Sequence, residues 1–120
     1  ADIGISGANF LIADNGSIVT VTNEGNAELT VTPPKTHIAT VGIEKIVPSM
    51  EHATVLLRLL SRAAIGAEIT QYTTFYNGPK RKGDADGPEN MHIVLVDNTE
   101  PKCLANSYAR CSDAFVVVLA

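Results

Sequence analysis

The sequence has few cysteines, no long hydrophobic run and no excess of positive charge, and each shortage excludes a class of protein. Its two cysteines, Cys103 and Cys111, are too few for a secreted disulfide scaffold and lack the C-x-x-C spacing of many zinc sites. A formal net charge of −4 argues against a nucleic-acid-binding surface, which is usually basic. No apolar run approaches the ~20 residues of a membrane-spanning helix. We therefore expect a cytoplasmic protein that neither binds nucleic acid nor inserts into a membrane.

The remaining composition is that of one small globular domain. The chain has 120 residues, of which 45% are hydrophobic and 18% are charged. A chain of this length buries roughly two-thirds of its unfolded surface, so it has room for one modest core. The frequency of Val, Ile and Leu excludes intrinsic disorder.

The first third of the chain has the pattern of a β-hairpin. Two runs rich in β-forming residues, 8–13 and 17–22, are separated by Asp14-Asn15-Gly16, and Asn-Gly suits the positive φ angles of a type I′ turn. A third short run, residues 27–32, is also predicted to be a strand. The two prolines that follow it end the strand, because proline lacks the amide donor that a sheet requires.

The middle of the chain alternates between strand and helix patterns. A buried strand is predicted over residues 37–43, and a helix runs from an N-cap at Ser49 to Gly66, with its apolar residues at helical spacing. Further strands are predicted over residues 69–76, 92–96 and 115–119. This order favours a right-handed crossover from 37–43 through the helix to a parallel strand at 69–76. We therefore expect an α/β fold with a mixed, mostly parallel sheet, helical cover and an N-terminal β-hairpin.

The turn Asn23-Glu24-Gly25-Asn26 is the first candidate site. A carboxylate in a glycine-containing turn after a strand can be held by backbone amides at the end of the sheet, where α/β proteins bind ligands. Glu24 could then act as a nucleophile or general base. The alternative is that these residues form a solvated turn without a catalytic role.

A surface loop over residues 77–90 is the second candidate site. It carries the basic run Lys80-Arg81-Lys82, which could bind a phosphate or a carboxylate substrate. The alternative is a solvated loop, because acidic residues follow directly and neutralise the basic ones. His37, His52 and His92 have no second ligand at metal-binding spacing on the same element, so we expect structural histidines and no metal site.

Three long stretches together resemble a known family. ISGANFLIADNGSIVTVTNEGN, PPKTHIATVGIEKIVPSMEHA and NGPKRKGDADGPENMHIVLVDN are similar, in this order, to the later part of the LUD domain in the iron-sulfur subunit of bacterial lactate-utilisation complexes. The resemblance covers about residues 1–98. It implies a partial NagB/RpiA/CoA-transferase-like fold and a role in oxidising L-lactate to pyruvate through iron-sulfur clusters, together with the other lactate-utilisation subunits.

The resemblance also bears on the site and on cofactors. CoA transferases of this superfamily use a glutamate in a similar turn, which implies Glu24 as the catalytic residue, with Asn23, Gly25 and Asn26 beside it. The family subunit continues into two four-cysteine motifs for 4Fe-4S clusters, whereas the tail over residues 99–120 diverges. Two cysteines cannot hold a cluster, so we expect no cofactor in this chain.

The chain therefore resembles a single truncated LUD domain over residues 1–120 that is inactive alone. Truncation of a parallel sheet leaves unpaired strands and apolar faces, so we expect a homo-oligomer that covers them. Two alternatives remain open. One is an acyl-CoA or sugar-phosphate enzyme that uses Glu24 with Lys80 and Arg81 as anion anchors, and the other is a structural oligomerisation module.

Overall fold

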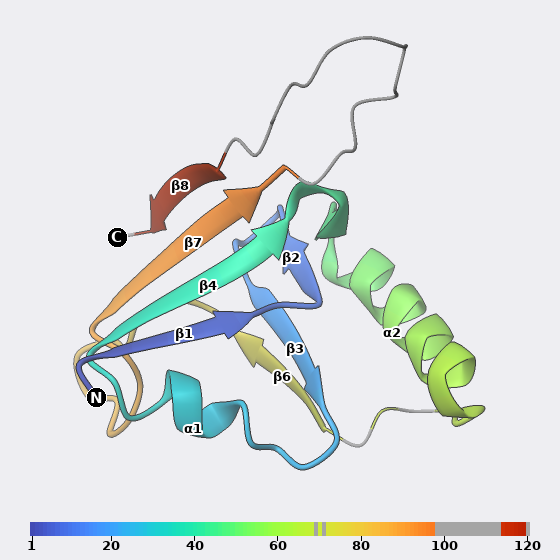
Figure 1. Ribbon diagram of the computed structural model, residues 1–120, viewed down its shortest axis with the longest axis horizontal. Coiled ribbons are helices and arrows are strands. Elements are labelled where there is room, and N and C mark those ends of the chain that lie inside the picture. The colour runs from blue at the N-terminus through green and yellow to red at the C-terminus, as the bar shows by residue number, and fades with distance from the viewer. Residues whose placement is uncertain (69, 71, 98–113, 120) are drawn as a thin grey trace, which may run out of the picture.

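Two four-stranded sheets and one long helix form three successive layers in the computed structural model of the chain (Figure 1). The structure describes residues 1–68, 70, 72–97 and 114–119. The predicted mixed α/β architecture, with a mostly parallel sheet, helical cover and an N-terminal hairpin, is confirmed, although the strands divide between two sheets.

The first sheet is parallel except at one edge. Its strand order is β1-β4-β7-β8, in which β1, β4 and β7 run parallel and β8 is antiparallel to β7. The strands are β1 (Ile3–Gly7), β4 (Thr36–Gly42), β7 (Asn90–Val96) and β8 (Ala114–Leu119). The strands predicted over 37–43, 92–96 and 115–119 are thus confirmed.

The second sheet contains the predicted hairpin. Its order is β5-β2-β3-β6, formed by β2 (Phe10–Ile12), β3 (Ile18–Thr22), β5 (Ile46–Val47) and β6 (Tyr72–Tyr76). Strands β2 and β3 are antiparallel, and Gly16 in their connection has a φ of 71°. The Ile12 amide donates to the Ser17 carbonyl, so the connection has four residues and is longer than the expected type I′ turn.

The predicted crossover from β4 to the strand at 69–76 is wrong. Strand β6 pairs antiparallel with β3 in the second sheet, and β7 is the strand that returns parallel beside β4. The reason lies in the two faces of β6. Phe75 packs against the core below the long helix, whereas Tyr76 packs against the core between the sheets. Strand β6 therefore lies in the second sheet, which separates these two cores.

The strand predicted over residues 27–32 is also wrong, because these residues form the short helix α1 (Glu28–Val31). The amide of Thr32 donates to the carbonyl of Glu28, so this turn satisfies its own backbone and needs no neighbouring strand. Val31 is buried, and the Thr30 carbonyl lies directly over Gly4 of β1, where a Cβ atom would overlap it. Glycine at position 4 therefore allows α1 to pack on β1.

The long helix α2 (Met50–Ile65) covers the second sheet and follows the 3₁₀ turn η1 (Ile43–Lys45). Ser49 occupies the predicted N-cap position, but its hydroxyl bonds the ring Nδ1 of His52 at 2.9 Å and not a backbone amide. Gly66 ends the helix with a φ of 70°, as predicted. The buried face of α2 is narrower than the helical spacing of its apolar residues suggests, since Leu59 is 61% exposed.

Two hydrophobic cores separate the three layers. The core between the sheets contains Ala8, Leu11, Ile18, Ala39, Val41, Met91 and Ile93. The core between the second sheet and α2 contains Ile12, Val19, Val47, Ala53 and Leu57. The second sheet is thus covered on both faces.

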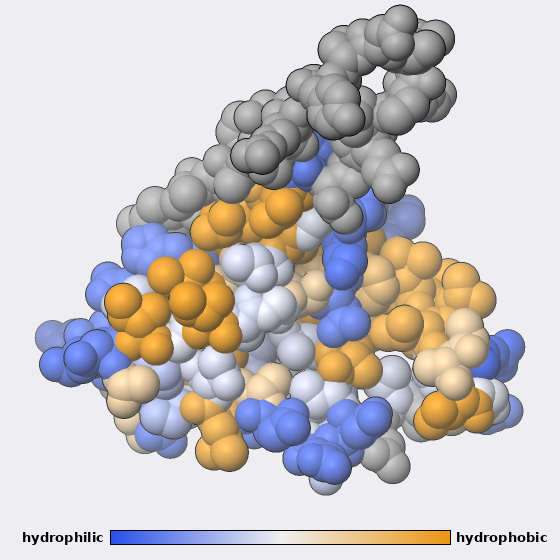
Figure 2. All heavy atoms as spheres, in the orientation of Figure 1, coloured by the Kyte–Doolittle hydropathy of each residue, from blue (hydrophilic) through white to orange (hydrophobic). Residues whose placement is uncertain are grey.

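The outer face of the first sheet is hydrophobic and uncovered by any other described element. Ile3 and Ile5 of β1 are 55% and 64% exposed, and Ile5 is in register with Ile38 of β4. Figure 2 shows hydrophobic side chains gathered over β1, β4 and β7 on the face turned to the viewer. Parallel sheets are normally covered on both faces, whereas no described element covers the outer face of this one.

Candidate functional site

The layer between the two sheets contains polar side chains among its apolar ones. His37 of β4 is fully buried, and its Nε2 lies 2.8 Å from the Oγ of Ser6 on the neighbouring strand β1. The His37 ring faces Tyr76 of β6 across the layer, with ring centroids 6.0 Å apart. Three polar atoms are buried without a hydrogen-bond partner among the described residues: Thr20 Oγ1, His37 Nδ1 and the Tyr76 hydroxyl. Buried polar groups are normally paired, so this layer is a candidate for a functional site.

Burial sets the protonation states of the two ring side chains. Burial lowers the pKa of His37 below its ordinary value of 6.5, so the imidazole is neutral at pH 7. Burial raises the pKa of Tyr76 above 10.0, and the negative charge of Glu28 on α1 raises it further. The neighbouring Thr74 hydroxyl, which donates to Glu28 Oε1 at 3.3 Å, lowers the pKa of Tyr76 and so opposes this shift. The Tyr76 hydroxyl therefore stays protonated at pH 7.

A polar hollow of about 520 Å³ lies where α1 and β6 end, and we call it the β6–β7 hollow. It is an open depression lined by the connection between β6 and β7, which Figure 1 places with α1 near the beginnings of β1, β4 and β7. The residues that line it are Val31, Thr32, Phe75, Tyr76, Asn77, Gly78, Pro79, Lys80, Arg81, Asp84, Asp86, Gly87 and Pro88. Lys80 and Arg81, predicted as ligand-binding residues, thus lie together with Tyr76.

The charges of the β6–β7 hollow are only partly paired. Lys80 Nζ lies 3.5 Å from Glu89 Oε1, in an ion pair that is open to solvent. The Asp84 carboxylate accepts the backbone amide of Arg81 at 2.8 Å. In the described part of the chain, the Arg81 guanidinium has no hydrogen-bond or ion-pair partner. Among the described residues, Arg81 is therefore the unpaired cation of this hollow.

The turn that carries Glu24 lies away from this hollow. Strands β3 and β6 pair Thr22 with Tyr72 and Ile18 with Tyr76, so the turn after Thr22 is at the opposite end of the pair from Lys80 and Arg81. The structure therefore does not bring Glu24 together with these two basic residues.

The turn has the geometry of a local loop. Gly25 has a φ of 68° and its amide donates to Thr22 Oγ1, while Asn23, Glu24 and Asn26 are exposed. A catalytic role for Glu24, with Asn23, Gly25 and Asn26 beside it, stays a prediction.

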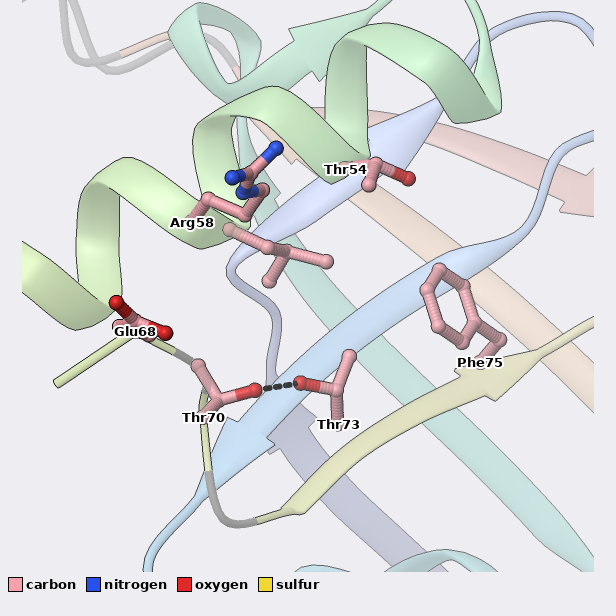
Figure 3. Close-up of a pocket in the computed structure, with 7 residues that line it drawn as sticks. Thr54, Arg58, Glu68, Thr70, Thr73 and Phe75 are labelled. Carbon is pink, nitrogen blue, oxygen red and sulfur yellow. Dashed lines mark hydrogen bonds between the residues drawn. The ribbon is translucent and has the colours of Figure 1, made fainter.

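A second hollow, also of about 520 Å³, lies between α2 and β6 (Figure 3). In Figure 3 Thr54 and Arg58 project from α2, and Thr73 and Phe75 belong to β6. Its threonine hydroxyls are hydrogen-bonded, because Thr70 and Thr73 bond each other and Thr54 donates to the Met50 carbonyl. This hollow is mainly an apolar groove beside the core.

Neither a metal centre nor a membrane helix is found in the described ranges. No three His, Cys, Asp or Glu side chains there are placed to share a metal ion, and no helix is long and apolar enough to cross a membrane. Cys103 and Cys111 lie outside the described residues. Since a 4Fe-4S cluster needs four thiolates and the chain has two cysteines, its residues do not fit this cofactor.

Sequence reasoning missed Tyr76, Thr20 and Glu28 as members of a site. A signal for Tyr76 was present, because alternation along β6 places Tyr72, Thr74 and Tyr76 on one face. The sequence could not show that this face meets α1 and His37, since those contacts join distant segments.

Comparison with known proteins gives consistent results for the fold from β1 to β7. The family model named LUD domain matches residues 1–96. Proteins named lactate utilization protein B from Shouchella clausii and Geobacillus sp. (strain WCH70) are 50% and 51% identical over 90% of this chain. An uncharacterized electron transport protein of Escherichia coli, YkgF, is 48% identical over the same share. The chain spans 23% of the length of each of these relatives.

A solved structure supports the fold. The crystal structure of a DUF162 family protein from Deinococcus radiodurans superposes with a TM-score of 0.58 at 20% identity, over 79% of this chain and 53% of that one. The family match covers both sheets up to β7 and both helices, and the identity to the relatives extends beyond it. The chain belongs to the LUD domain family.

Proposed function

We propose that this chain acts in the cytoplasm as the LUD domain of a lactate-utilisation protein and takes part in the oxidation of L-lactate to pyruvate. The supporting observation is the identity of about 50% over 90% of the chain to proteins named lactate utilization protein B. In this proposal the electrons pass to 4Fe-4S clusters held by other parts of the complex, because the two cysteines here cannot hold one. The domain contributes binding surfaces and does not oxidise lactate alone.

A chimera tests this proposal. The segment of the Geobacillus sp. relative that aligns with this chain is replaced by this sequence, in a bacterium whose growth on L-lactate depends on that relative. We expect growth on L-lactate to be retained, because half of the residues are identical and the fold is shared. The purified 120-residue chain should give no lactate-dependent reduction of an artificial electron acceptor.

The matched control is the same chimera with Ile18→Asp, which places a charge in the core between the sheets. This control should fail on L-lactate and grow normally on acetate. A chimera that is folded and abundant but cannot support growth on L-lactate would disprove the proposed function. Lactate oxidation by the isolated chain would disprove the proposal that the domain contributes binding surfaces only.

The uncovered outer face of the first sheet supports self-association as part of this proposal. Ile3 and Ile5 are more than half exposed, and β1 is an edge strand without a charged residue or proline. Such an edge lacks the features that normally prevent pairing with another chain. Two-fold dimers are the commonest soluble oligomers, and a two-fold dimer would cover this face on both copies.

Sedimentation equilibrium measures this association directly. We expect a dimer at micromolar concentration, and we expect Ile5→Lys to shift the chain towards monomer, because the substitution places a charge on the apolar face. Lys45→Ala, on the exposed turn η1, is the control and should leave the mass unchanged. A stable monomer at micromolar concentration would contradict the proposed dimer.

A further inference from the structure

Two Asn-Gly pairs lie in turns of this chain, Asn15-Gly16 in the hairpin and Asn77-Gly78 directly after β6. An asparagine before a glycine can modify itself, because the glycine amide nitrogen can attack Cγ of the asparagine side chain and glycine has no Cβ to obstruct the approach. Both asparagines are exposed, so water reaches both. Neither the dipeptide nor its exposure therefore distinguishes the two pairs.

The attacking nitrogen is occupied in one pair and free in the other. The Gly16 amide donates to the carbonyl of Ile12 at 2.8 Å. The Gly78 amide has no hydrogen-bond partner among the residues that the structure describes. A bonded amide has to give up its hydrogen bond before the nitrogen can lose its proton and attack. The fold therefore protects Asn15 and leaves Asn77 open to attack.

A buried hydroxyl bonds the side chain of Asn77. Ser17 is fully buried, and its Oγ donates to Oδ1 of Asn77 at 2.6 Å. A donor at this oxygen stabilises the negative charge that the oxygen acquires during attack on Cγ, and it leaves the departing Nδ2 untouched. Asn15 also receives a donor, the Ser17 amide at 3.0 Å. The state of the glycine amide is therefore what separates the two pairs, and Ser17 adds to the reactivity of Asn77.

We propose that Asn77 is a site of spontaneous deamidation and that Asn15 is protected from this reaction in the folded chain. The Gly78 nitrogen gives its proton to water or hydroxide and bonds to Cγ of Asn77, while the Cγ–Nδ2 bond breaks and ammonia leaves. Water then opens the resulting succinimide at either of its carbonyls, which yields aspartate or isoaspartate. Water is the only co-reactant.

The product changes the charge of the β6–β7 hollow. Asn77 is among the residues that line this hollow, and the formal charges of its lining residues Lys80, Arg81, Asp84 and Asp86 cancel. Deamidation adds one negative charge, so a neutral hollow becomes acidic. Isoaspartate also lengthens the main chain by a methylene group directly after β6.

Peptide mapping by mass spectrometry, after incubation of the 120-residue chain at mildly alkaline pH, measures both sites in one sample. Trypsin places Asn15 and Asn77 on separate peptides, because Lys35 and Arg62 lie between them. In the folded chain we expect Asn77 to deamidate about tenfold faster than Asn15, the rate ratio that corresponds to one hydrogen bond. In urea both pairs lose their folded surroundings, so this difference should disappear.

Ser17→Ala tests the hydroxyl donor. It removes the hydrogen bond to Asn77 Oδ1 and keeps the backbone amide that bonds Asn15. We expect deamidation of Asn77 to slow by about fivefold, the effect of one neutral hydrogen bond. Thr54→Ala is the control, because it removes an exposed hydroxyl from α2, and it should leave the rate unchanged.

Asn15 reports whether Ser17→Ala is folded, because unfolding removes the protection of Asn15. If Asn15 becomes reactive in this variant, Ser17→Cys replaces it, since cysteine is close to serine in size and its thiol is only a weak donor. We expect the same slowing of deamidation at Asn77 in Ser17→Cys.

Three results would overturn the inference. Equal rates at Asn15 and Asn77 in the folded chain would show that the hydrogen bond of Gly16 does not protect. Aspartate without isoaspartate would exclude ring closure by the Gly78 nitrogen. Unchanged or faster deamidation of Asn77 in a folded Ser17 variant would show that the hydroxyl restrains the side chain and does not activate it.

Discussion

Replacing Ile18 by alanine is expected to lower the free energy of unfolding by about 2–5 kcal/mol, the cost of removing a large aliphatic side chain from a core. Ile18 is fully buried between the two sheets, in the cluster that also contains Met91 and Ile93. The rigid sheets on both sides prevent collapse into the space that alanine leaves. Since domains of this size are stable by only about 5–15 kcal/mol, the loss is a large fraction of the total.

Urea unfolding monitored by circular dichroism measures this loss. Ile65→Ala is the matched control, because Ile65 is 75% exposed at the end of α2, and it should change stability by no more than about 0.5 kcal/mol. If Ile18→Ala does not fold, Ile18→Val should fold with a loss of about 0.5–1.5 kcal/mol. If Ile18→Ala and Ile65→Ala lowered the free energy of unfolding equally, Ile18 would not be part of a packed core between the sheets.

Acidification is expected to destabilise the chain through His37. The pKa of His37 is lowered by burial in the folded protein, whereas the unfolded chain titrates near 6.5. Below pH 6.5 the unfolded state therefore binds more protons, so stability is complete above this pH and falls as the pH drops towards the folded pKa. Ser6 and Tyr76 face the ring, and neither carries a negative charge at this pH that could stabilise an imidazolium.

Unfolding free energies between pH 5 and pH 8 (about 1.5 units either side of the ordinary histidine pKa) measure this dependence. His37→Gln cannot be protonated and should flatten the curve over this range. His52→Gln is the control, because His52 is exposed at the start of α2, and it should leave the curve unchanged. A curve for His37→Gln that falls as steeply as that of the unsubstituted chain would disprove the role of His37.

Helix ends, turns and strands that are determined by a few neighbouring residues could be predicted from the sequence. The hairpin loop at Gly16 and the end of α2 at Gly66 both use glycine with a positive φ, and both were found at the expected positions. The strands β4 and β7 were predicted for a similar reason, since short apolar runs are typical of buried strands. None of these predictions depends on knowing a partner strand.

Elements whose form depends on distant residues could not be predicted in this way. Helix α1 packs on β1 because Gly4 leaves room for the Thr30 carbonyl, and β6 joins the second sheet because its two faces meet two different cores. The candidate site likewise has one part that neighbouring residues determine and one part that distant residues determine. The loop with Lys80 and Arg81 was predicted from its composition, whereas its proximity to Tyr76 follows only from the fold.

The central position of β4 in the first sheet has a consequence for folding kinetics. Thr36 pairs with Ile3 on one side and with Asn90 on the other, so β4 acquires its second neighbour only after the residues of β7 have been synthesised. Loop closure over such separations slows folding. The hairpin and α2 have short-range contacts and can form early on the ribosome, while the parallel sheet, which contains His37, closes only once β7 is present.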